Sequence, residues 1–464
     1  MQFKPGTDGN LEIKEEYKMV DKAREIALKI LYKIDKEDAF SNIVLDEKIN
    51  ENRKKLNDRD IGLISEIVYG VVTWRLTLDE IIKKYSNIKL KKISVWILNI
   101  LRIGIYQIIF LDKIPKSAAV NESVNLAKRY GHKSSANFVN AILRKVEKKD
   151  YNELFEIEND IERISKTTSM PSWIIEELLK EKTIEEVEKI CKASNERPNI
   201  SIRVNKLKIT KEKLKEELNK NNIQFEDGIL DDFLIIKKIK NIENLDLFKK
   251  GFFTIEDEGA GLIPIILNPK QNEIILDACS APGGKTTYMA EIMHNKGKIE
   301  AWDIYEHRLK LVKQNAKRLG INIIETKVND ATKYNEKYKE KFDKILLDVP
   351  CLGIGVLKRK PDIKWKRKKE DIKEIQKIQF EILNNCSKYL KKGGEIVYST
   401  CSILKQENEE IINKFIKNNE LFVVKNIDLD EKKYLKKISK LDNYLQIYQN
   451  KKTDGFFICK IQKM

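Results

Sequence analysis

Two cysteines stand where a thiol could carry out covalent chemistry. Cys351 ends the run Asp348-Val349-Pro350-Cys351, and Cys401 lies in Ser399-Thr400-Cys401. A short apolar run, typical of a buried strand, precedes each of them. Because parallel strands end at one edge of a sheet, we expect both thiols to lie in one site, where a thiolate can be stabilised and exposed.

Such a pair suits methylation of a pyrimidine carbon. Carbon 5 of cytosine is a poor nucleophile, but a thiolate that adds at carbon 6 enables it to attack a methylsulfonium. The proton on carbon 5 must then leave and the thiolate must be expelled, which gives a second thiol a function. Asp348 could hold N3 of the cytosine and stabilise the charge that develops during addition.

A glycine-containing loop offers a place for the cofactor. The strand predicted at 274–276 leads into Cys279, Ser280, Ala281, Pro282, Gly283, Gly284 and Lys285, and a helix follows. A glycine turn between a strand and a helix lets a ligand approach backbone N–H groups at the positive end of the helix dipole. Gly284-Lys285-Thr286 matches the end of a phosphate-binding P-loop. Because Cys279 stands where that motif needs its first glycine, the sequence does not predict a nucleoside triphosphatase.

Acidic residues close successive strands of the same region. Asp303, Asp330 and Asp348 each follow an apolar strand pattern. A single strand-end aspartate is usually a turn former or a helix cap, but three in series favour a ligand held in the crevice that the strand ends share. Asp303 is placed where an acid would accept hydrogen bonds from ribose hydroxyls.

The composition bounds the class of protein. With 464 residues, 41% of them hydrophobic, the chain is long enough for about three domains. Its net charge of +17 favours a polyanionic partner. Six scattered cysteines without a C-x-x-C pair predict reduced thiols, no zinc site and a cytoplasmic location, with Cys191, Cys386 and Cys459 as core residues.

Three folded domains are predicted after a disordered extension at residues 1–18. Residues 19–150 show helical patterns alone, and the apolar window 93–111 contains polar residues that favour a core helix over a membrane span. Residues 151–255 mix helix and strand and predict a small α+β linker or RNA-binding module. Residues 256–464 alternate strands with amphipathic helices, which predicts an α/β Rossmann-like domain with a parallel sheet covered on both faces.

Five short motifs follow one another along the helical region: Asp58-Arg59-Asp60, Tyr69-Gly70-Val71, Leu101-Arg102-Ile103-Gly104-Ile105-Tyr106, Ala118-Ala119-Val120-Asn121-Glu122 and Asn137-Phe138-Val139-Asn140. In this order they resemble the helical RNA-binding domain of the antiterminator NusB. The resemblance implies an RNA-docking domain. A bundle that only docks another domain is the alternative.

Four motifs of the remaining chain occur together in one family: residues 277–286, Asp348-Val349-Pro350-Cys351-Leu352-Gly353-Ile354-Gly355, Tyr398-Ser399-Thr400-Cys401-Ser402 with Glu407-Asn408-Glu409, and Asp454-Gly455-Phe456-Phe457. They resemble the RNA cytosine-C5 methyltransferases that depend on S-adenosylmethionine, which have a class I methyltransferase domain. The resemblance implies that Cys401 is the nucleophile and that Cys351 assists product release. It also implies cofactor binding by residues 279–285, Asp303, Asp330 and Asp348. DNA cytosine-C5 methyltransferases attack with the Pro-Cys thiol instead, so the presence of both cysteines matches the RNA class.

With the NusB-like region in front, the chain resembles the bacterial members of this family that act on 16S ribosomal RNA. The resemblance implies that the partner is 16S ribosomal RNA, either free or in a partly assembled small subunit. It also implies that the enzyme is a monomer. Two alternatives stay open: a transfer RNA cytosine-C5 methyltransferase, and a non-catalytic RNA-binding or antitermination factor. Ser280 departs from the family pattern, in which alanine is common.

Basic residues near the site are candidates for RNA contact. Residues 358–360 and 364–369 surround Trp365 and offer charge for phosphates with an aromatic ring for stacking, although a solvated helix start is the alternative. Arg197 and Arg203 could also touch phosphate. Their spacing is not distinctive, so a structural role is the favoured interpretation.

Overall fold

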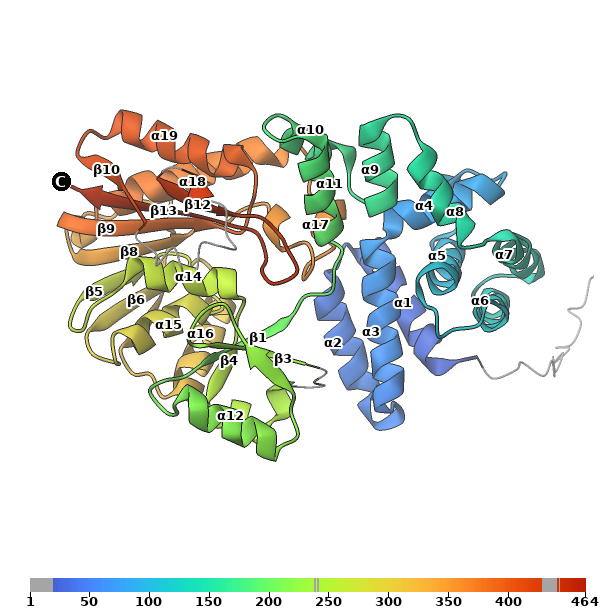
Figure 1. Cartoon of the computed structure of the whole chain (residues 1–464), viewed down its shortest axis with the longest axis horizontal. Helices are drawn as coiled ribbons and strands as arrows, with labels where there is room; N and C mark the ends of the chain where they lie inside the picture. The colour runs from blue at the N-terminus through green and yellow to red at the C-terminus, as the bar shows by residue number, and fades with distance from the viewer. Residues whose placement is uncertain (1–19, 238, 240–241, 428–439, 442) are drawn as a thin grey trace, which may run out of the picture. The chain divides into compact units, whose positions relative to one another are not determined.

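The computed structural model describes residues 20–237, 239, 242–427, 440–441 and 443–464. The extension predicted at residues 1–18 lies outside the described residues. The chain divides into two compact units, the first ending at Ser169 and the second beginning at Met170 (Figure 1). The domain boundaries at 150 and 255 stay predictions.

The first unit is helical throughout the described residues 20–169, whereas the sequence predicted helices alone for residues 19–150. An N-terminal capping box starts α3, where the Asn57 side chain accepts from the backbone of Asp60 and the Asp60 side chain accepts from the backbone of Asn57. The elements of the unit are α1 (Lys22–Glu37), α2 (Ser41–Asn52), η1 (Arg53–Lys55), α3 (Asp58–Thr73), α4 (Arg75–Tyr85), η2 (Leu90–Lys92), α5 (Val95–Phe110), α6 (Lys116–Tyr130), α7 (Lys133–Lys145), α8 (Lys149–Asn152), η3 (Glu153–Glu156) and α9 (Asp160–Thr168).

Helix α5 is the buried centre of this unit, and its buried Arg102 is paired with acidic side chains of other helices. The Arg102 guanidinium makes two bonds to the Asp79 carboxylate, at 2.7 and 2.8 Å, and a third to Asp35 at 2.9 Å. Within the described residues, no single helix is both long and apolar enough to cross a membrane. Helices α3 and α4 meet the length and composition criteria only as a pair, which is bent by 77°.

The second unit opens with a small α+β module. Helices α10 (Ser172–Leu179) and α11 (Ile184–Ala193) precede an antiparallel sheet of order β2-β3-β1-β4. Leu214 and Leu218 of α12 pack in one apolar cluster with this sheet. The module contains β1 (Ile200–Val204), α12 (Lys211–Lys220), β2 (Phe225–Asp227), β3 (Phe233–Ile236), η4 (Ile242–Asn244), α13 (Asp246–Lys249) and β4 (Phe253–Ile255).

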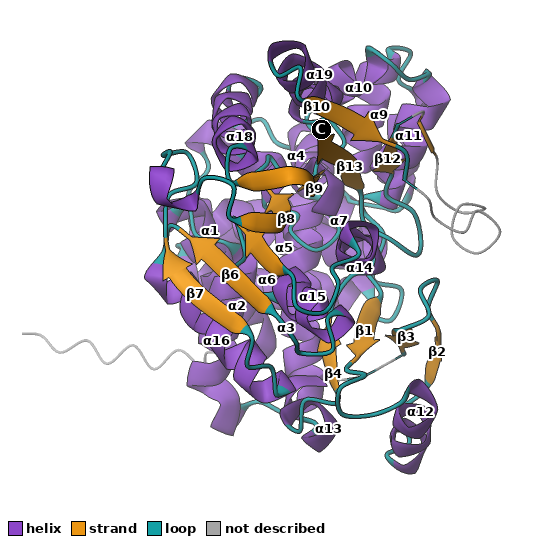
Figure 2. Cartoon of the chain, turned by 90° about the vertical axis from the view of Figure 1, so that its left-hand side faces the viewer, coloured by secondary structure: helices purple, strands orange, loops and turns teal. Residues whose placement is uncertain are grey.

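The larger sheet is mixed, whereas the sequence predicted a parallel one. Strands β5 to β9 pair in parallel in the order β7-β6-β5-β8-β9, and β13 then joins antiparallel between β9 and β12 (Figure 2). The strands are β5 (Ile274–Asp277), β6 (Lys298–Asp303), β7 (Ile324–Val328), β8 (Phe342–Asp348), β9 (Leu390–Thr400), β10 (Phe422–Lys425), β11 (Lys440–Leu441), β12 (Tyr444–Ile447) and β13 (Phe456–Lys463).

Helices cover both faces of this sheet, as predicted (Figure 1). Trp302 of β6 packs in a core cluster with side chains of α18 and α19, whereas its neighbour Ala301 packs with α16 on the opposite face. The helices of this region are α14 (Glu258–Leu267), α15 (Gly284–Ile292), α16 (Glu306–Leu319), η5 (Glu336–Tyr338), η6 (Ile354–Val356), α17 (Ile363–Lys366), α18 (Asp371–Ser387), η7 (Lys405–Glu407) and α19 (Glu409–Asn418).

The strand order reverses beside β5. The chain passes from β5 to β6 and β7 on one side and then returns to β8 on the other. At such a reversal the loops diverge and leave a ligand crevice outside the carboxyl ends of the strands. The last residues of β5, β6 and β8 at that edge are Asp277, Asp303 and Asp348.

Replacement of Arg102 by Met leaves the Asp79 and Asp35 carboxylates without their shared cation. We expect the free energy of opening of the helical unit to fall by about 3 kcal/mol, because a buried charge loses its partner. Hydrogen exchange of α4 and α5 amides in the full chain measures this loss. Lys149→Met, which removes a lysine 66% exposed, is the matched control. Equal protection in both variants would contradict the prediction.

Candidate active site

The loop after β5 is shaped by a glycine and by helix α16. Gly283 has φ +103°, in the left-handed region that favours glycine, and a Cβ added there would lie 3.1 Å from Cα of Val312. Side chains of Arg308 and Asn315 each donate to a carbonyl of this loop at 3.1 Å. These contacts hold the loop so that the first turn of α15 presents its N–H groups at the carboxyl edge of the sheet.

Asp277 closes β5 as a buried carboxyl. Its Oδ2 accepts from the Thr286 hydroxyl at 2.7 Å, while Oδ1 is buried and has no hydrogen-bond partner among the described residues. Burial raises the pKa of this carboxyl to about 7, although the Thr286 hydrogen bond acts in the opposite direction. Asp277 was not among the predicted cofactor residues, and its place at the strand end is the signal that could have found it.

The acids that close β6 and β7 also have local partners. Asp303 accepts from the Tyr305 backbone N–H at 3.0 Å and pairs with Arg308 at 3.0 Å. Asp330 accepts from the backbone N–H and the hydroxyl of Thr332, at 3.0 and 2.6 Å. These hydrogen bonds fit turn formation, so the ligand roles of Asp303 and Asp330 stay predictions.

The glycine loop, which was predicted to bind the cofactor, lies beside the ends of β6 and β7. The Ser280 N–H donates to the Trp302 carbonyl at 2.8 Å, one residue before Asp303. The Asn329 N–H donates to the Asp303 carbonyl at 3.2 Å, and Asn329 Nδ2 is buried without a partner in the described part of the chain. The predicted residues of this loop and both acids therefore share one edge of the sheet.

Lys285 joins the loop to β8. Its ammonium pairs with Asp348 Oδ2 at 2.7 Å, while Ser399 Oγ donates to Asp348 Oδ1 at 2.9 Å. Burial disfavours the charge of Lys285, but the Asp348 carboxylate outweighs it and raises the pKa of the ammonium, with smaller contributions from Glu256 and Cys401. Lys285 therefore stays positively charged beside the cysteine loops.

The structure brings the two cysteines into contact. Cys351 Sγ and Cys401 Sγ are 3.0 Å apart, and both thiols are free. The hydrogen bond to Cys401 and burial raise the pKa of Cys351 well above its ordinary value. Cys351 therefore keeps its proton at neutral pH. The expectation that β8 and β9 place both thiols at one edge agrees with this geometry.

Two glycines close the backbone around Cys401. The Gly355 N–H donates to the Cys401 carbonyl at 2.9 Å, and the Gly455 N–H donates to the Gly355 carbonyl at 2.8 Å. A Cβ on Gly355 would lie only 2.2 Å from the Gly455 carbonyl oxygen. Only glycine fits this approach, which links the cysteine loops to the start of β13.

Arg203 is a structural residue, as the favoured interpretation predicted. It lies on β1 of the small module with no exposed side chain, and it pairs with Glu256 at 2.6 Å and Glu291 at 2.9 Å. Its guanidinium also donates to the Gly284 carbonyl at 3.1 Å and lies 4.3 Å from the Tyr288 ring centroid. Arg203 thereby attaches the small module to the first turns of α15, a role that the sequence did not predict.

Three basic residues of the segments 358–360 and 364–369 bind other parts of the protein, and RNA contact by these segments stays a prediction. Lys358 donates to the carbonyls of Asn450 and Thr453 at 2.7 and 2.9 Å. Arg359 pairs with Asp454 at 2.5 Å and with Asp257 at 3.0 Å, both on other segments of the second unit. Lys364 is buried and donates to Asn195 at 2.5 Å, and burial lowers its pKa to about 7. These side chains hold the segment in place through contacts with other parts of the second unit.

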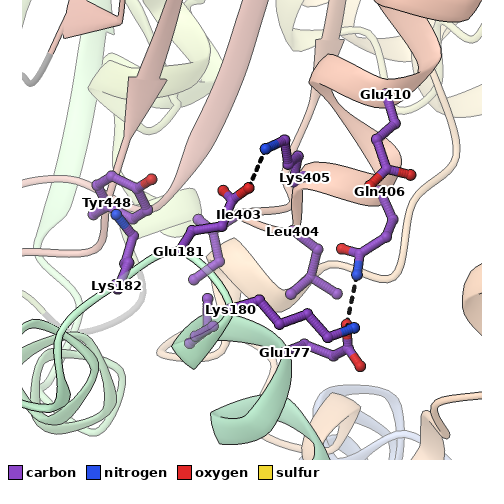
Figure 3. A pocket seen from close by; sticks show the side chains of 11 residues that line it. Glu177, Lys180, Glu181, Lys182, Ile403, Leu404, Lys405, Gln406, Glu410 and Tyr448 are labelled. Atoms are coloured by element: carbon purple, nitrogen blue, oxygen red, sulfur yellow. Dashed lines mark hydrogen bonds and ion pairs between the residues drawn. The ribbon is translucent and has the colours of Figure 1, made fainter.

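A pocket of about 180 Å³ borders the loop that follows Cys401. Lys405 pairs with Glu181, and Gln406 donates to Glu177 at 2.5 Å (Figure 3). Helix α10 and the segment after it therefore hold this loop. The lining residues are Glu177, Leu178, Lys180, Glu181, Lys182, Ile403, Leu404, Lys405, Gln406, Glu410 and Tyr448.

Three family models match successive parts of the chain. The NusB family covers residues 21–148, the ferredoxin-like domain of RsmF/B-like methyltransferases covers 170–243, and the 16S rRNA methyltransferase RsmB/F family covers 264–462.

Named relatives match over most of their length. The chain is 38% identical to the probable ribosomal RNA small subunit methyltransferase B of Bacillus subtilis, over 95% of this chain and 98% of that protein. It is 33% identical to the ribosomal RNA small subunit methyltransferase B of Shewanella oneidensis, over 85% and 89%.

Solved structures show the same architecture. The crystal structure of PH0851 has a TM-score of 0.79 at 26% identity and covers 96% of this chain and all of that one. A methyltransferase homologue from Pyrococcus horikoshii has a TM-score of 0.58 at 28% identity, covering 66% and 100%.

The sheet order, the glycine loop at the strand reversal and these matches define a methyltransferase with an α/β catalytic domain. Within that class, the chain belongs to the RsmB/F family of ribosomal RNA methyltransferases, with the NusB-type domain in front.

The raised pKa of Asp277 makes stability depend on pH. The pKa of Asp277 is about 7 in the folded protein, and the ordinary value is 3.8. The contribution of this group to the free energy of unfolding is therefore fully present below about pH 4 and is lost as the pH rises through 7. Asp277→Asn removes the titration and keeps an acceptor for Thr286. Without cofactor, the wild type should lose stability relative to the variant between pH 4 and 7, at up to about 1.4 kcal/mol per pH unit. Urea unfolding across this range measures the difference, and a pH-independent difference would contradict the assignment.

Arg203→Met leaves Glu256 and Glu291 buried without a cation and frees the Gly284 carbonyl. We expect a loss of about 3 kcal/mol in unfolding free energy and at least a tenfold weaker affinity for S-adenosylmethionine, because the glycine loop loses its support. Denaturant unfolding and calorimetric titration measure the two effects. Lys206→Met, a substitution of a lysine 57% exposed on the same segment, should change neither. If the Arg203 variant bound the cofactor with full affinity, Arg203 would not be needed to support the glycine loop, and the prediction would be wrong.

Proposed function

We propose that this protein transfers a methyl group from S-adenosylmethionine to carbon 5 of a cytosine in 16S ribosomal RNA, through a covalent adduct on Cys401. The single observation that carries the proposal is the contact of two free thiols, 3.0 Å apart, beside the Lys285–Asp348 ion pair. Methylation of a nitrogen or an oxygen needs no such thiol pair, whereas cytosine carbon 5 needs a nucleophile at carbon 6.

The residues present fit the proposed cofactor. A Cβ at Gly283 or Gly284 would meet Val312 at 3.1 Å or Glu256 at 3.0 Å, so glycine is needed for the loop to pack this closely on its neighbours. Asp277 Oδ1 and Asn329 Nδ2 are buried polar atoms without partners among the described residues. The residues that would hold the cofactor are the loop from Cys279 to Lys285, Asp303, Asp330 and Asp348. When bound, S-adenosylmethionine supplies an electrophilic methyl group on a sulfonium.

Cys401 begins the reaction on the base. Its thiolate adds to carbon 6, so that an Sγ–C6 bond forms and the electron pair of the C5–C6 double bond becomes available at carbon 5. As the electron density on the ring rises, N3 takes a proton from solvent, and the Asp348 carboxylate, which Lys285 keeps in place, accepts a hydrogen bond from the N3–H. Carbon 5 then takes the methyl group.

Cys351 assists the release. After methylation the proton on carbon 5 leaves to a base, the C5–C6 double bond re-forms and the Sγ–C6 bond breaks. The thiol of Cys351, which keeps its proton and lies 3.0 Å from Cys401 Sγ, is placed to stabilise the departing thiolate. A protonated neighbour makes the returning sulfur a better leaving group.

Several features support the RNA substrate. The relatives are named for small-subunit ribosomal RNA, the first unit matches the NusB family, and the net charge is +17. We propose that the NusB-like domain docks this RNA and that the enzyme acts as a cytoplasmic monomer with reduced thiols. A cytosine that is attacked from its face must be unstacked, which is easiest in a loop.

Single cysteine variants separate the two roles. Cys401→Ala should lower methyl transfer at least about 1,000-fold, because it removes the nucleophile. Cys351→Ala should instead accumulate a denaturant-resistant protein–RNA adduct, because release is slowed. Unmodified 16S ribosomal RNA with labelled S-adenosylmethionine, gel analysis and bisulfite mapping measure both outcomes.

The matched control is Cys386→Ala, which removes a buried core thiol of α18 outside the site. An adduct that accumulates with Cys401→Ala instead would reverse the assignment of roles. Methylation of transfer RNA but not of 16S ribosomal RNA would keep the chemistry and overturn the substrate.

A further inference from the structure

We propose that Glu407 is the positioning residue that sets the distance between the two thiols. The proposal rests on the proposed function in one respect, the use of Cys401 and Cys351 together. Glu407 contacts neither sulfur in any hydrogen bond of the structure, so its role is to place the two loops that carry them.

One carboxylate holds the residue that follows each cysteine. Glu407 Oε2 accepts from the Leu352 N–H at 2.8 Å, and Oε1 accepts from the Ser402 hydroxyl. Leu352 is next to Cys351, and Ser402 is next to Cys401. The two oxygens of this single carboxylate therefore connect the two cysteine loops.

The residues before the cysteines are held from the same place. Gln379 of α18 donates both to Glu407 Oε2, at 3.2 Å, and to the Pro350 carbonyl, at 3.0 Å. Thr400 donates its hydroxyl to Asn408 Oδ1 at 2.6 Å. Each cysteine is thus restrained on both sides by Glu407 or by a residue in contact with it or next to it.

Further bonds keep Glu407 itself from moving. The Tyr398 hydroxyl donates to the Glu407 carbonyl at 2.8 Å, and Asn408 Nδ2 donates to the Ser402 carbonyl at 3.2 Å. Glu407 has no exposed surface. A buried acceptor that satisfies three donors on separate segments has one favourable position, and this fixes the relative position of the segments.

The acceptor, rather than the charge, carries the role. Burial raises the pKa of Glu407, and hydrogen bonds from Ser402, Leu352 and Gln379 act against that rise. In Glu407→Gln the carboxamide oxygen still accepts from Leu352, and the amide group can donate to the Ser402 hydroxyl, which rotates to accept. Glu407→Gln should therefore preserve the spacing, whereas Glu407→Ala releases both loops.

Disulfide formation between the two thiols measures their spacing directly. Diamide oxidises the pair: an Sγ–Sγ bond forms, and both thiol protons and two electrons pass to the N=N bond, which is reduced to the hydrazine. The rate of the Cys351–Cys401 cross-link, read by peptide mass spectrometry, requires no RNA and no methyl transfer. Glu407→Ala should slow this rate at least tenfold, and Glu407→Gln should stay within about threefold of wild type.

Activity and cofactor binding complete the test. Glu407→Ala should lower kcat for methyl transfer at least thirtyfold while the affinity for S-adenosylmethionine stays within twofold, a split that general loss of folding would not give. Glu420→Ala, which removes an exposed glutamate after α19, is the matched control and should resemble wild type. If Glu407→Ala does not fold, Ser402→Ala removes one of the three contacts and should slow cross-linking by a smaller factor.

The outcomes separate this proposal from the proposed function. Cross-linking of Glu407→Ala or, where that variant does not fold, of Ser402→Ala at the wild-type rate overturns the positioning role, whatever the substrate proves to be. A slow cross-link in the variant, together with a wild-type protein that makes no 5-methylcytosine, keeps the positioning role and overturns the proposed reaction. Failure of Glu407→Gln to restore cross-linking would show that the charge and not the acceptor is required.

Discussion

The ion pair between Lys285 and Asp348 connects the parts of the site. Lys285 belongs to the glycine loop after β5, where we propose that the cofactor binds. Asp348 ends β8, and its second oxygen accepts from Ser399 of β9, two residues before Cys401. An ion pair that is largely removed from water stabilises a protein only when its remaining lone pairs are also used, and here both carboxylate oxygens have donors. A shift of the backbone at the end of any one of these three strands therefore changes the hydrogen bonds at the other two.

Local sequence patterns predicted the parts of the molecule that local chemistry determines. Glycine and lysine after a strand, acids at strand ends and two cysteines after apolar runs all follow from the geometry of parallel strands, and the structure places them at one edge. The antiparallel strands were not predicted, because β13 pairs with β9 across more than fifty residues of chain. Nothing in the apolar pattern of 456–463 specifies its direction.

The sequence favoured a structural role for Arg203 and RNA contact for the basic segments near the site, but it did not identify the partners of either, for a physical reason. Arg203 meets Glu256 and Glu291, and Arg359 meets Asp454 and Asp257, all far away in sequence. A guanidinium can match buried carboxylates as well as it matches phosphates, so the residue type alone does not separate the two. Only the arrangement of partners in space shows that these arginines join modules.

The contact of Gly355 with Gly455 has a consequence for biosynthesis. The backbone around Cys401 is complete only when residue 455, more than fifty residues further along the chain, has reached it. A nascent polypeptide that has been synthesised as far as β9 therefore contains both thiols but not the backbone at Gly455 that packs beside them. The cysteine pair therefore acquires its final geometry only after residue 455 has been synthesised and has packed against Gly355.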